Sequence, residues 1–141
     1  MIERSFDADR INELVNHPTI RPYVGGDGKS HLDLTATVTN LQNYWLLGPH
    51  GGFGYIWTAP DTYEIHTFIL PEGRGREAYR LAQESLKFMK SQGATHLWTR
   101  VDPEAANVRR FTLSAGLKPA GHNTVDLGGG PVTYDLFHWR A

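Results

Sequence analysis

The stretch YEIHTFILPEGRGREAYRLAQESLKFMKSQG, residues 63–93, changes from a strand pattern to a helix pattern within a few residues. Tyr63 to Leu70 is rich in β-branched and aromatic residues and predicts a strand. Arg74 to Gln92 repeats apolar or small residues at helical spacing, and Gly93 ends the pattern. The repeating residues are Ala78, Leu81, Ala82, Ser85, Leu86 and Met89.

The elements on either side of this stretch predict one mixed sheet. A strand pattern over Thr95 to Val101 follows the helix, so strand, helix and strand make a right-handed parallel crossover. Short apolar runs at Tyr44 to Leu47 and Phe53 to Thr58 precede it, separated by the turn residues Pro49 to Gly52. These two runs predict antiparallel strands that form a meander with the strand over Tyr63 to Leu70.

The outer segments carry shorter patterns. Together with the centre they predict an α/β fold of α+β type, with a mixed antiparallel and parallel sheet flanked by about four helices. The predicted outer elements are a helix over Asp7 to Val15, a loop over His17 to Ser30, a helix over Leu32 to Leu41 where threonines also favour a strand, a helix over Pro103 to Ala115 closed by Gly116, and a strand pair over Thr124 to Leu127 and Val132 to Trp139.

Composition narrows the class of protein. The length of 141 residues, with 40% hydrophobic and 21% charged residues, predicts a single domain over residues 1–141. A formal net charge of -1 argues against nucleic-acid and membrane partners, so any anion binding must be local. The chain has no cysteine, which excludes disulfides and thiolate chemistry and favours the cytoplasm. Residues Met1 to Arg10 lack the apolar core of a signal peptide.

The turn from Leu70 to Ala78 is the best candidate for anion binding. A helix N-terminus offers unpaired N–H groups and the positive end of the helix dipole. Two glycines there permit close backbone approach, and Arg74 and Arg76 add positive charge. An ordinary strand-to-helix turn with solvated arginines is the alternative.

The motif Pro71-Glu72-Gly73-Arg74-Gly75 resembles the pyrophosphate-binding turn of the GNAT superfamily of acyl-CoA N-acyltransferases. The resemblance covers about residues 43 to 139 and implies a GNAT-like fold with acetyl-CoA as co-substrate. The chain departs from the family at Glu77, where the family has glycine, and at Tyr79, where it has a small residue. A carboxylate beside a pyrophosphate is unfavourable. The cofactor-binding residues implied are Phe68, Ile69, Leu70, Arg74, Gly75, Arg76, Glu77, Ala78, Asn107 and Phe111.

A second segment, Thr95 to Gly121, is similar to the family's later strand and helix. The asparagine that often contacts the cofactor falls at Ala105, and Asn107 lies two residues away. The family's frequent tyrosine acid falls at Thr112, which leaves Ser114 as the nearby hydroxyl candidate for catalysis. His17-Pro18-x-Ile20-Arg21-Pro22 also resembles short GNAT-like proteins of tailed bacteriophages, which would place the protein in the host cytoplasm; an irregular loop stiffened by two prolines is the other interpretation.

Glu64 and His66 are the candidate bases for deprotonating an amine. Strand alternation places both on one face with Phe68. The unperturbed pKa of histidine, about 6.5, suits this role better than that of glutamate, about 4.3, so His66 is favoured. A structural histidine is the alternative. Direct attack in a ternary complex agrees with the lack of cysteine, and the resemblance implies an oxyanion site at a backbone N–H around Phe68 to Leu70.

Two functions therefore remain open: an N-acetyltransferase for a small-molecule or protein amine, and a catalytically degenerate GNAT-fold binding or virion-associated protein. No P-loop or serine-hydrolase motif is present. The histidines have no zinc-binding spacing, so no metal is expected. Arg100, Arg109 and Arg110 form either a solvated patch or contacts to the 3′-phosphate of coenzyme A. The strand Tyr134 to Trp139 can pair within the subunit or in a homodimer. The aromatic residues proposed to line the acceptor site, or else to belong to the core, are Tyr23, Trp45, Trp57, Tyr134 and Trp139.

Overall fold

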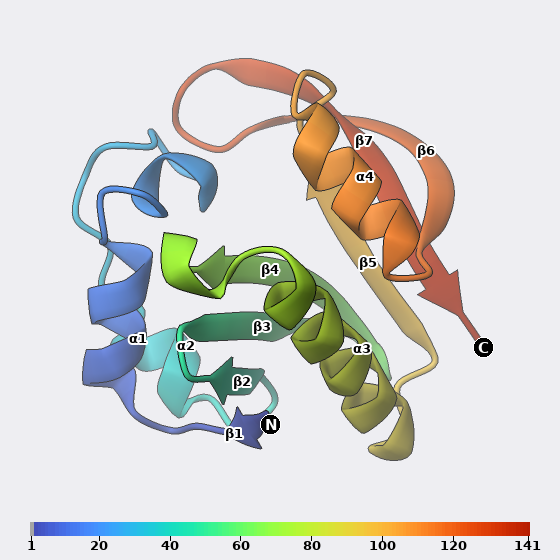
Figure 1. The fold of residues 1–141 in the computed structure, drawn as a ribbon. Helices are drawn as coiled ribbons and strands as arrows, with labels where there is room; N and C mark the ends of the chain where they lie inside the picture. Colours follow the sequence, from blue (N-terminus) through green and yellow to red (C-terminus); the bar gives the residue numbers. More distant parts are fainter. Residues whose placement is uncertain (1) are drawn as a thin grey trace.

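Seven strands form one mixed sheet in the computed structural model, which describes residues 2–141. Their order across the sheet is β1-β2-β3-β4-β5-β7-β6 (Figure 1). The strands are β1 (Glu3–Arg4), β2 (Tyr44–Gly48), β3 (Gly51–Ala59), β4 (Thr62–Ile69), β5 (His96–Val101), β6 (Lys118–Asp126) and β7 (Pro131–Arg140). The helices are α1 (Ala8–Val15), α2 (Thr35–Thr39), α3 (Arg76–Ser91) and α4 (Ala106–Ser114), with 3-10 turns η1 (Arg21–Tyr23) and η2 (Pro71–Gly73). The predicted α/β class and mixed sheet are confirmed.

The parallel crossover is confirmed, and its ladder is short. β4 and β5 pair in parallel only from Thr62 opposite His96 to Glu64 opposite Trp98. Beyond that point the hydroxyl of Thr99 donates a hydrogen bond to the carbonyl of Ile65, 3.0 Å away. Both strands then continue without pairing, so they diverge into a fork at this end of the sheet.

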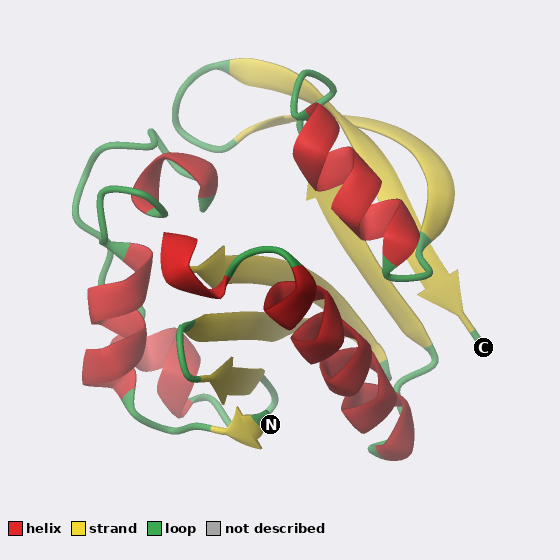
Figure 2. Ribbon diagram, in the orientation of Figure 1, coloured by secondary structure: helices red, strands yellow, loops and turns green. Residues whose placement is uncertain are grey.

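The helices cover the two faces of the sheet differently (Figures 1 and 2). The face with Ile65 and Leu97 packs against α3 and α4, and we call it the α3 face. The face with Trp45 and Phe68 packs against α1 and α2, and we call it the α1 face. Because side chains alternate along a strand, Glu64 and His66 lie on the α1 face with Phe68.

The central helix is confirmed in register, although it begins two residues later than predicted. All six repeating residues of α3 are buried. The helix begins later because the 3-10 turn η2 occupies Pro71–Gly73. Gly75 is its N-cap and has a φ of 90°, which suits glycine. Gly93, with a φ of 96°, follows its C-terminus. At α1 the predicted cap is also observed: the carboxylate of Asp7 accepts from the N–H of Arg10 at 3.0 Å.

Several outer elements differ from the prediction. Over Leu32 to Leu41 only Thr35–Thr39 is helical, since threonines favour helices weakly and Val38 alone is buried there. Strand β6 starts at Lys118, six residues before the predicted Thr124, with an irregularity between Pro119 and His122. Strand β1 was not predicted because two residues carry no periodicity. No helix in residues 2–141 is long and apolar enough to cross a bilayer.

Candidate active site

Three charged or ionisable side chains meet at the fork between β4 and β5. The guanidinium of Arg100, on β5, donates to Oε2 of Glu64 on β4 at 2.5 Å. The same oxygen lies 3.6 Å from Nε2 of His66. The structure therefore brings together the two predicted bases, and adds an arginine that was predicted to be part of a basic patch.

The environment of Glu64 separates the roles of the two candidate bases. Its side chain is only 13% exposed, whereas that of His66 is 40% exposed. Burial alone would raise the pKa of Glu64, but attraction to His66 and Arg100 outweighs burial and lowers it. Glu64 is thus an anion at neutral pH and a poor proton acceptor. The geometry supports His66 as the base and Glu64 as its partner.

The backbone of β4 has free hydrogen-bonding directions after the point where its pairing with β5 ends. The N–H of Leu70 donates to the carbonyl of His50 at 2.9 Å, on the β3 side. Backbone groups alternate in direction along a strand, and the carbonyl of Ile65 already points toward β5. The N–H groups of Thr67 and Ile69 therefore point into the fork. Of the backbone N–H groups predicted to bind the oxyanion, that of Ile69 has the required direction. The N–H of Leu70 does not qualify, because it already donates to His50.

The N-terminus of α3 follows this strand after the short turn η2. Gly75 provides no side-chain cap, and a Cβ built on it would meet nothing within 4 Å. No side chain therefore caps the first N–H groups of the helix, and the side chain of Arg76 beside them is exposed. Arg74 is placed differently: it donates to the carbonyls of Ile69 and Thr19, both at 3.2 Å. Its guanidinium ties β4 to the segment after α1.

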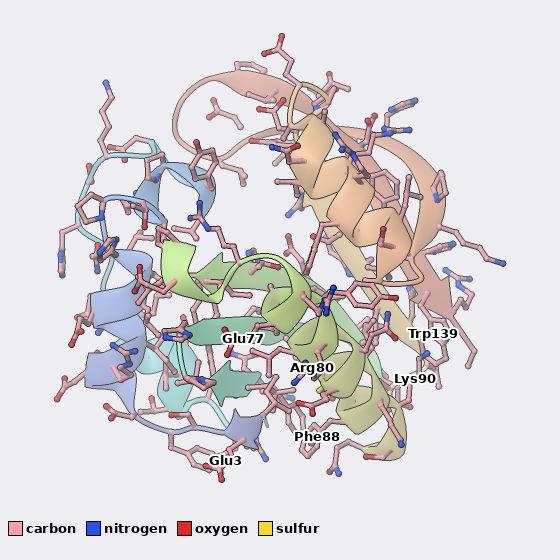
Figure 3. All side chains as sticks on the ribbon, viewed as in Figure 1. Glu3, Glu77, Arg80, Phe88, Lys90 and Trp139 are labelled. Atoms are coloured by element: carbon pink, nitrogen blue, oxygen red, sulfur yellow. The ribbon has the colours of Figure 1, made fainter. Side chains whose placement is uncertain are left out.

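Glu77, which departs from the family pattern, points to the β2–β3 turn. Its Oε2 lies 3.2 Å from Nδ1 of His50, and the two side chains are about equally exposed. The backbone of His50 is held close by Gly73, where a Cβ would come within 2.5 Å of the His50 Cβ. Figure 3 shows Glu77 on the first turn of α3. The negative charge thus stays near the helix N-terminus, with a histidine beside it.

The α4 candidates do not join this cluster. Phe111 packs on the core of the α3 face, and Asn107 is exposed, accepting weakly from Arg110 at 3.4 Å. Ser114 is exposed at the last residue of α4. It lies on the α3 face, whereas His66 lies on the α1 face, so the structure does not bring these two predicted catalytic residues together.

The predicted basic patch and aromatic wall are both divided. Arg100 pairs with Glu64, and Arg109 pairs with Asp135 at 2.6 Å on the α3 face. Trp45 is buried against α1 and α2, while the ring centre of Trp139 lies 4.4 Å from Nζ of Lys90 on α3. Figure 3 labels Lys90 and Trp139 near the C-terminal end of that helix. Among residues 2–141 no group of three metal-ligating side chains occurs.

No family model matches the sequence, and no curated protein matches it. Solved structures do match over the full length. A ribosomal-protein-alanine N-acetyltransferase from Brucella melitensis superposes with a TM-score of 0.76 at 12% identity, covering 100% of this chain and 99% of that one. The chain has the GNAT fold.

Two further structures have the same fold. A GNAT-family acetyltransferase from Bacillus anthracis has a TM-score of 0.72 at 17% identity and covers 99% of this chain and 93% of its own. YncA from Salmonella typhimurium, solved with its cofactor acetyl-CoA, has a TM-score of 0.72 at 12% identity, with 99% and 92% covered. The predicted GNAT-like fold is confirmed.

Two residues of this site escaped the sequence interpretation. Arg100 was grouped with other arginines because sequence distance hides its position opposite Glu64 across a parallel ladder. The register of that ladder was the missing signal, since it places both residues on the same face. His50 lies in a turn and carries no motif, so its contact with Glu77, 27 residues away, follows only from the packing of the β2–β3 turn against α3.

Proposed function

We propose that this protein is an acetyl-CoA-dependent N-acetyltransferase. One observation carries the proposal: the fork between β4 and β5 has Glu64 and His66 on the α1 face, and β4 leads through the short turn η2 to the uncapped N-terminus of α3. An anion site and a base thus flank the same opening. The GNAT fold, and the acetyl-CoA bound to one structure of that fold, support acetyl-CoA as the acyl donor.

The residues at the turn fit a pyrophosphate. The first N–H groups of α3 and the exposed guanidinium of Arg76 are donors to an anion, and the open space at Gly75 lets the anion approach the backbone. The N–H groups of Thr67 and Ile69 would bind the amide arm or the acetyl carbonyl. Acetyl-CoA would supply the activated acetyl group.

His66 would take a proton from the acceptor's ammonium group, directly or through a water. The neutral nitrogen attacks the acetyl carbonyl, the carbon–sulfur bond breaks, and the nitrogen loses its second proton as the thiol forms. Direct attack within a ternary complex needs no acyl-enzyme, and the chain has no cysteine to form one. Glu64 stabilises the imidazolium that forms on His66.

The acceptor is a small-molecule amine or a protein amine. Three structures of the same fold are named ribosomal-protein acetyltransferases, from Brucella melitensis, Vibrio cholerae and Vibrio fischeri. Because of those names, an acceptor screen should include protein amines beside small-molecule amines. No feature of the described residues favours the alternative of a catalytically degenerate, phage-type binding protein.

Isothermal titration with acetyl-CoA and with free coenzyme A tests the proposal. We expect a Kd near 1 µM, about -8 kcal/mol, weakened in Arg76→Ala and unchanged in Arg10→Ala, which alters a comparable arginine on α1. Acceptors are then screened by thiol release, for which a chain without cysteine gives no background. No binding at millimolar cofactor would overturn the proposal and revive the degenerate alternative.

A further inference from the structure

Arg100, Glu64 and His66 form one charge-coupled unit across the fork. The Arg100 and His66 nitrogens meet the same oxygen of Glu64, so they lie within about 6 Å of each other. We propose that Arg100 is a positioning residue that acts through Glu64, holding this carboxylate as an anion beside His66. The assignment of a catalytic consequence rests on the proposed function; the coupling itself does not.

Arg100 is held in place by its own neighbours. Its guanidinium lies 4.9 Å from the ring centre of Trp98, on the same strand and face. The indole N–H of Trp98 donates to the hydroxyl of Thr58 on β3 at 3.2 Å. Among residues 2–141, Glu64 accepts the only side-chain hydrogen bond of Arg100, whose Nε is buried without a partner. The guanidinium is therefore directed at Glu64.

The unit also joins the strands where their ladder stops. Glu64 belongs to the last parallel pair, and Arg100 lies two residues beyond its partner Trp98. The ion pair and the bond from Thr99 to Ile65 connect β4 and β5 at the start of the fork. Arg100 therefore contacts the charge beside His66 and also connects β5 to β4 at the start of the fork.

Few other charges act on His66. Its cross-strand neighbour on β3 is Gly54, and Ile56 lies beside that glycine on the same face. Helix α1 packs on this face through apolar residues, and its charged side chains point away, with Arg10 paired to Glu13. Within the described residues Glu64 is the only carboxylate within 4 Å of the His66 ring. The charged or titratable groups of these elements, besides His66 itself, are Tyr55 on β3, Tyr63 and Glu64 on β4, His96 and Arg100 on β5, and Asp9, Arg10 and Glu13 on α1.

The coupling predicts opposite effects from its two members. Glu64→Gln leaves the Arg100 cation near His66 and disfavours the imidazolium, so the ring titrates at lower pH. Arg100→Met leaves the Glu64 anion uncompensated and favours the imidazolium, so the ring titrates at higher pH. Each shift should be about 0.5 to 1 pH unit, and the double variant should titrate near the parent protein. A merely structural role would not produce shifts of opposite sign.

Histidine NMR titration tests this directly, without any substrate. The protein is labelled with ¹³C in its histidine rings, and the His66 signal is assigned by its loss in His66→Gln. Arg100→Lys should keep the parent titration because it keeps the charge. Arg109→Met is the matched control, since it breaks a comparable arginine–carboxylate pair on the α3 face. Amide spectra of each variant establish that it is folded.

The outcomes separate the two proposals. Opposite shifts in Glu64→Gln and Arg100→Met support the inference, and the low-pH limb of kcat/KM should move with them. Shifts in the same direction, or no shift beyond that of Arg109→Met, overturn it even if the protein transfers acetyl groups. Opposite shifts in a protein that neither binds acetyl-CoA nor transfers acetyl groups would support the coupling and refute the proposed function.

Discussion

Tyr55 on β3 and Ser85 on α3 share a buried hydrogen bond, with 2.7 Å between their hydroxyl oxygens. The Ser85 hydroxyl also donates to the carbonyl of Ala82 at 2.9 Å, so the Tyr55 hydroxyl is the donor of the pair. Burial raises the pKa of Tyr55, which keeps the phenol protonated at any ordinary pH. This bond joins the sheet to the middle of α3, the helix whose N-terminus is the candidate anion site.

Removing either hydroxyl should destabilise the fold by different amounts. Ser85→Ala leaves the phenol buried without its acceptor and should lower the free energy of unfolding by about 1 to 3 kcal/mol. Tyr55→Phe leaves Ser85 bonded to Ala82 and should cost about 1 kcal/mol. Urea unfolding of both variants and of the double variant measures the difference. A larger loss in Tyr55→Phe than in Ser85→Ala would contradict this donor assignment.

The two arginines of the turn should separate binding from stability. Arg74→Ala removes two hydrogen bonds to backbone carbonyls, so we expect a loss of about 1 to 2 kcal/mol in unfolding free energy. Arg76→Ala should change stability by less than about 0.5 kcal/mol, because its side chain is exposed and forms no ion pair with any carboxylate of residues 2–141. Thermal unfolding without ligand checks both values. Equal losses would mean that Arg74 is as solvated as Arg76.

Glu77→Gln should tighten the binding of acetyl-CoA. The substitution removes a negative charge from the first turn of α3, and we expect a Kd about threefold to tenfold lower at low salt. It also removes a carboxylate that stabilises the helix dipole, so stability should fall by about 0.3 to 1 kcal/mol. Calorimetry measures the first effect and chemical unfolding the second. Glu13→Gln on α1 is the control, and weaker binding in Glu77→Gln would refute the repulsion.

The loop after η1 should loosen in acid. Asp27 accepts from the N–H groups of Lys29 and Ser30, both at 2.8 Å, and pairs with Arg21. Hydrogen bonds from Ser30, then from Lys29, lower the pKa of Asp27 below its ordinary 3.8. A lowered folded-state pKa means that the stabilisation is complete above the unfolded pKa and is lost as the pH falls below it.

Amide hydrogen exchange at Lys29 and Ser30 measures this loosening. Protection, corrected for intrinsic exchange, should fall between about pH 4 and pH 2. In Asp27→Asn the protection should be low at every pH, because the amide accepts more weakly than the carboxylate. Protection that stays constant through this range in the parent protein would show that the carboxylate does not hold the loop.

The sequence predicted the centre of this fold better than its edges. Helix α3 and its neighbouring strands have long apolar patterns, and burial of Leu81, Leu86 and Met89 follows from their spacing. Strand β1 and most of β6 have none: β6 is almost wholly exposed, so its side chains were free to be polar. Short or exposed elements depend on pairing with neighbours, which a single sequence does not encode locally.

The candidate site was predicted in part for the same reason. Glu64 and His66 are two residues apart on one strand, so alternation alone places them together. The contact between Glu64 and Arg100 depends on the register between β4 and β5. The separation of Trp45 and Trp139 onto opposite faces likewise depends on how the strands pair. Roles assigned by resemblance, such as that of Ser114, had no such geometric check.

The short ladder between β4 and β5 has a mechanical consequence. On one side of this ladder the sheet consists of β1, β2, β3 and β4, and on the other side it consists of β5, β7 and β6. Three residue pairs join the two halves. A force that pulls the strands apart would act most strongly on this short ladder, so β4 and β5 should separate before the other strand pairs. A molecule bound in the fork would add contacts between β4 and β5, and its binding would therefore stiffen both halves of the sheet.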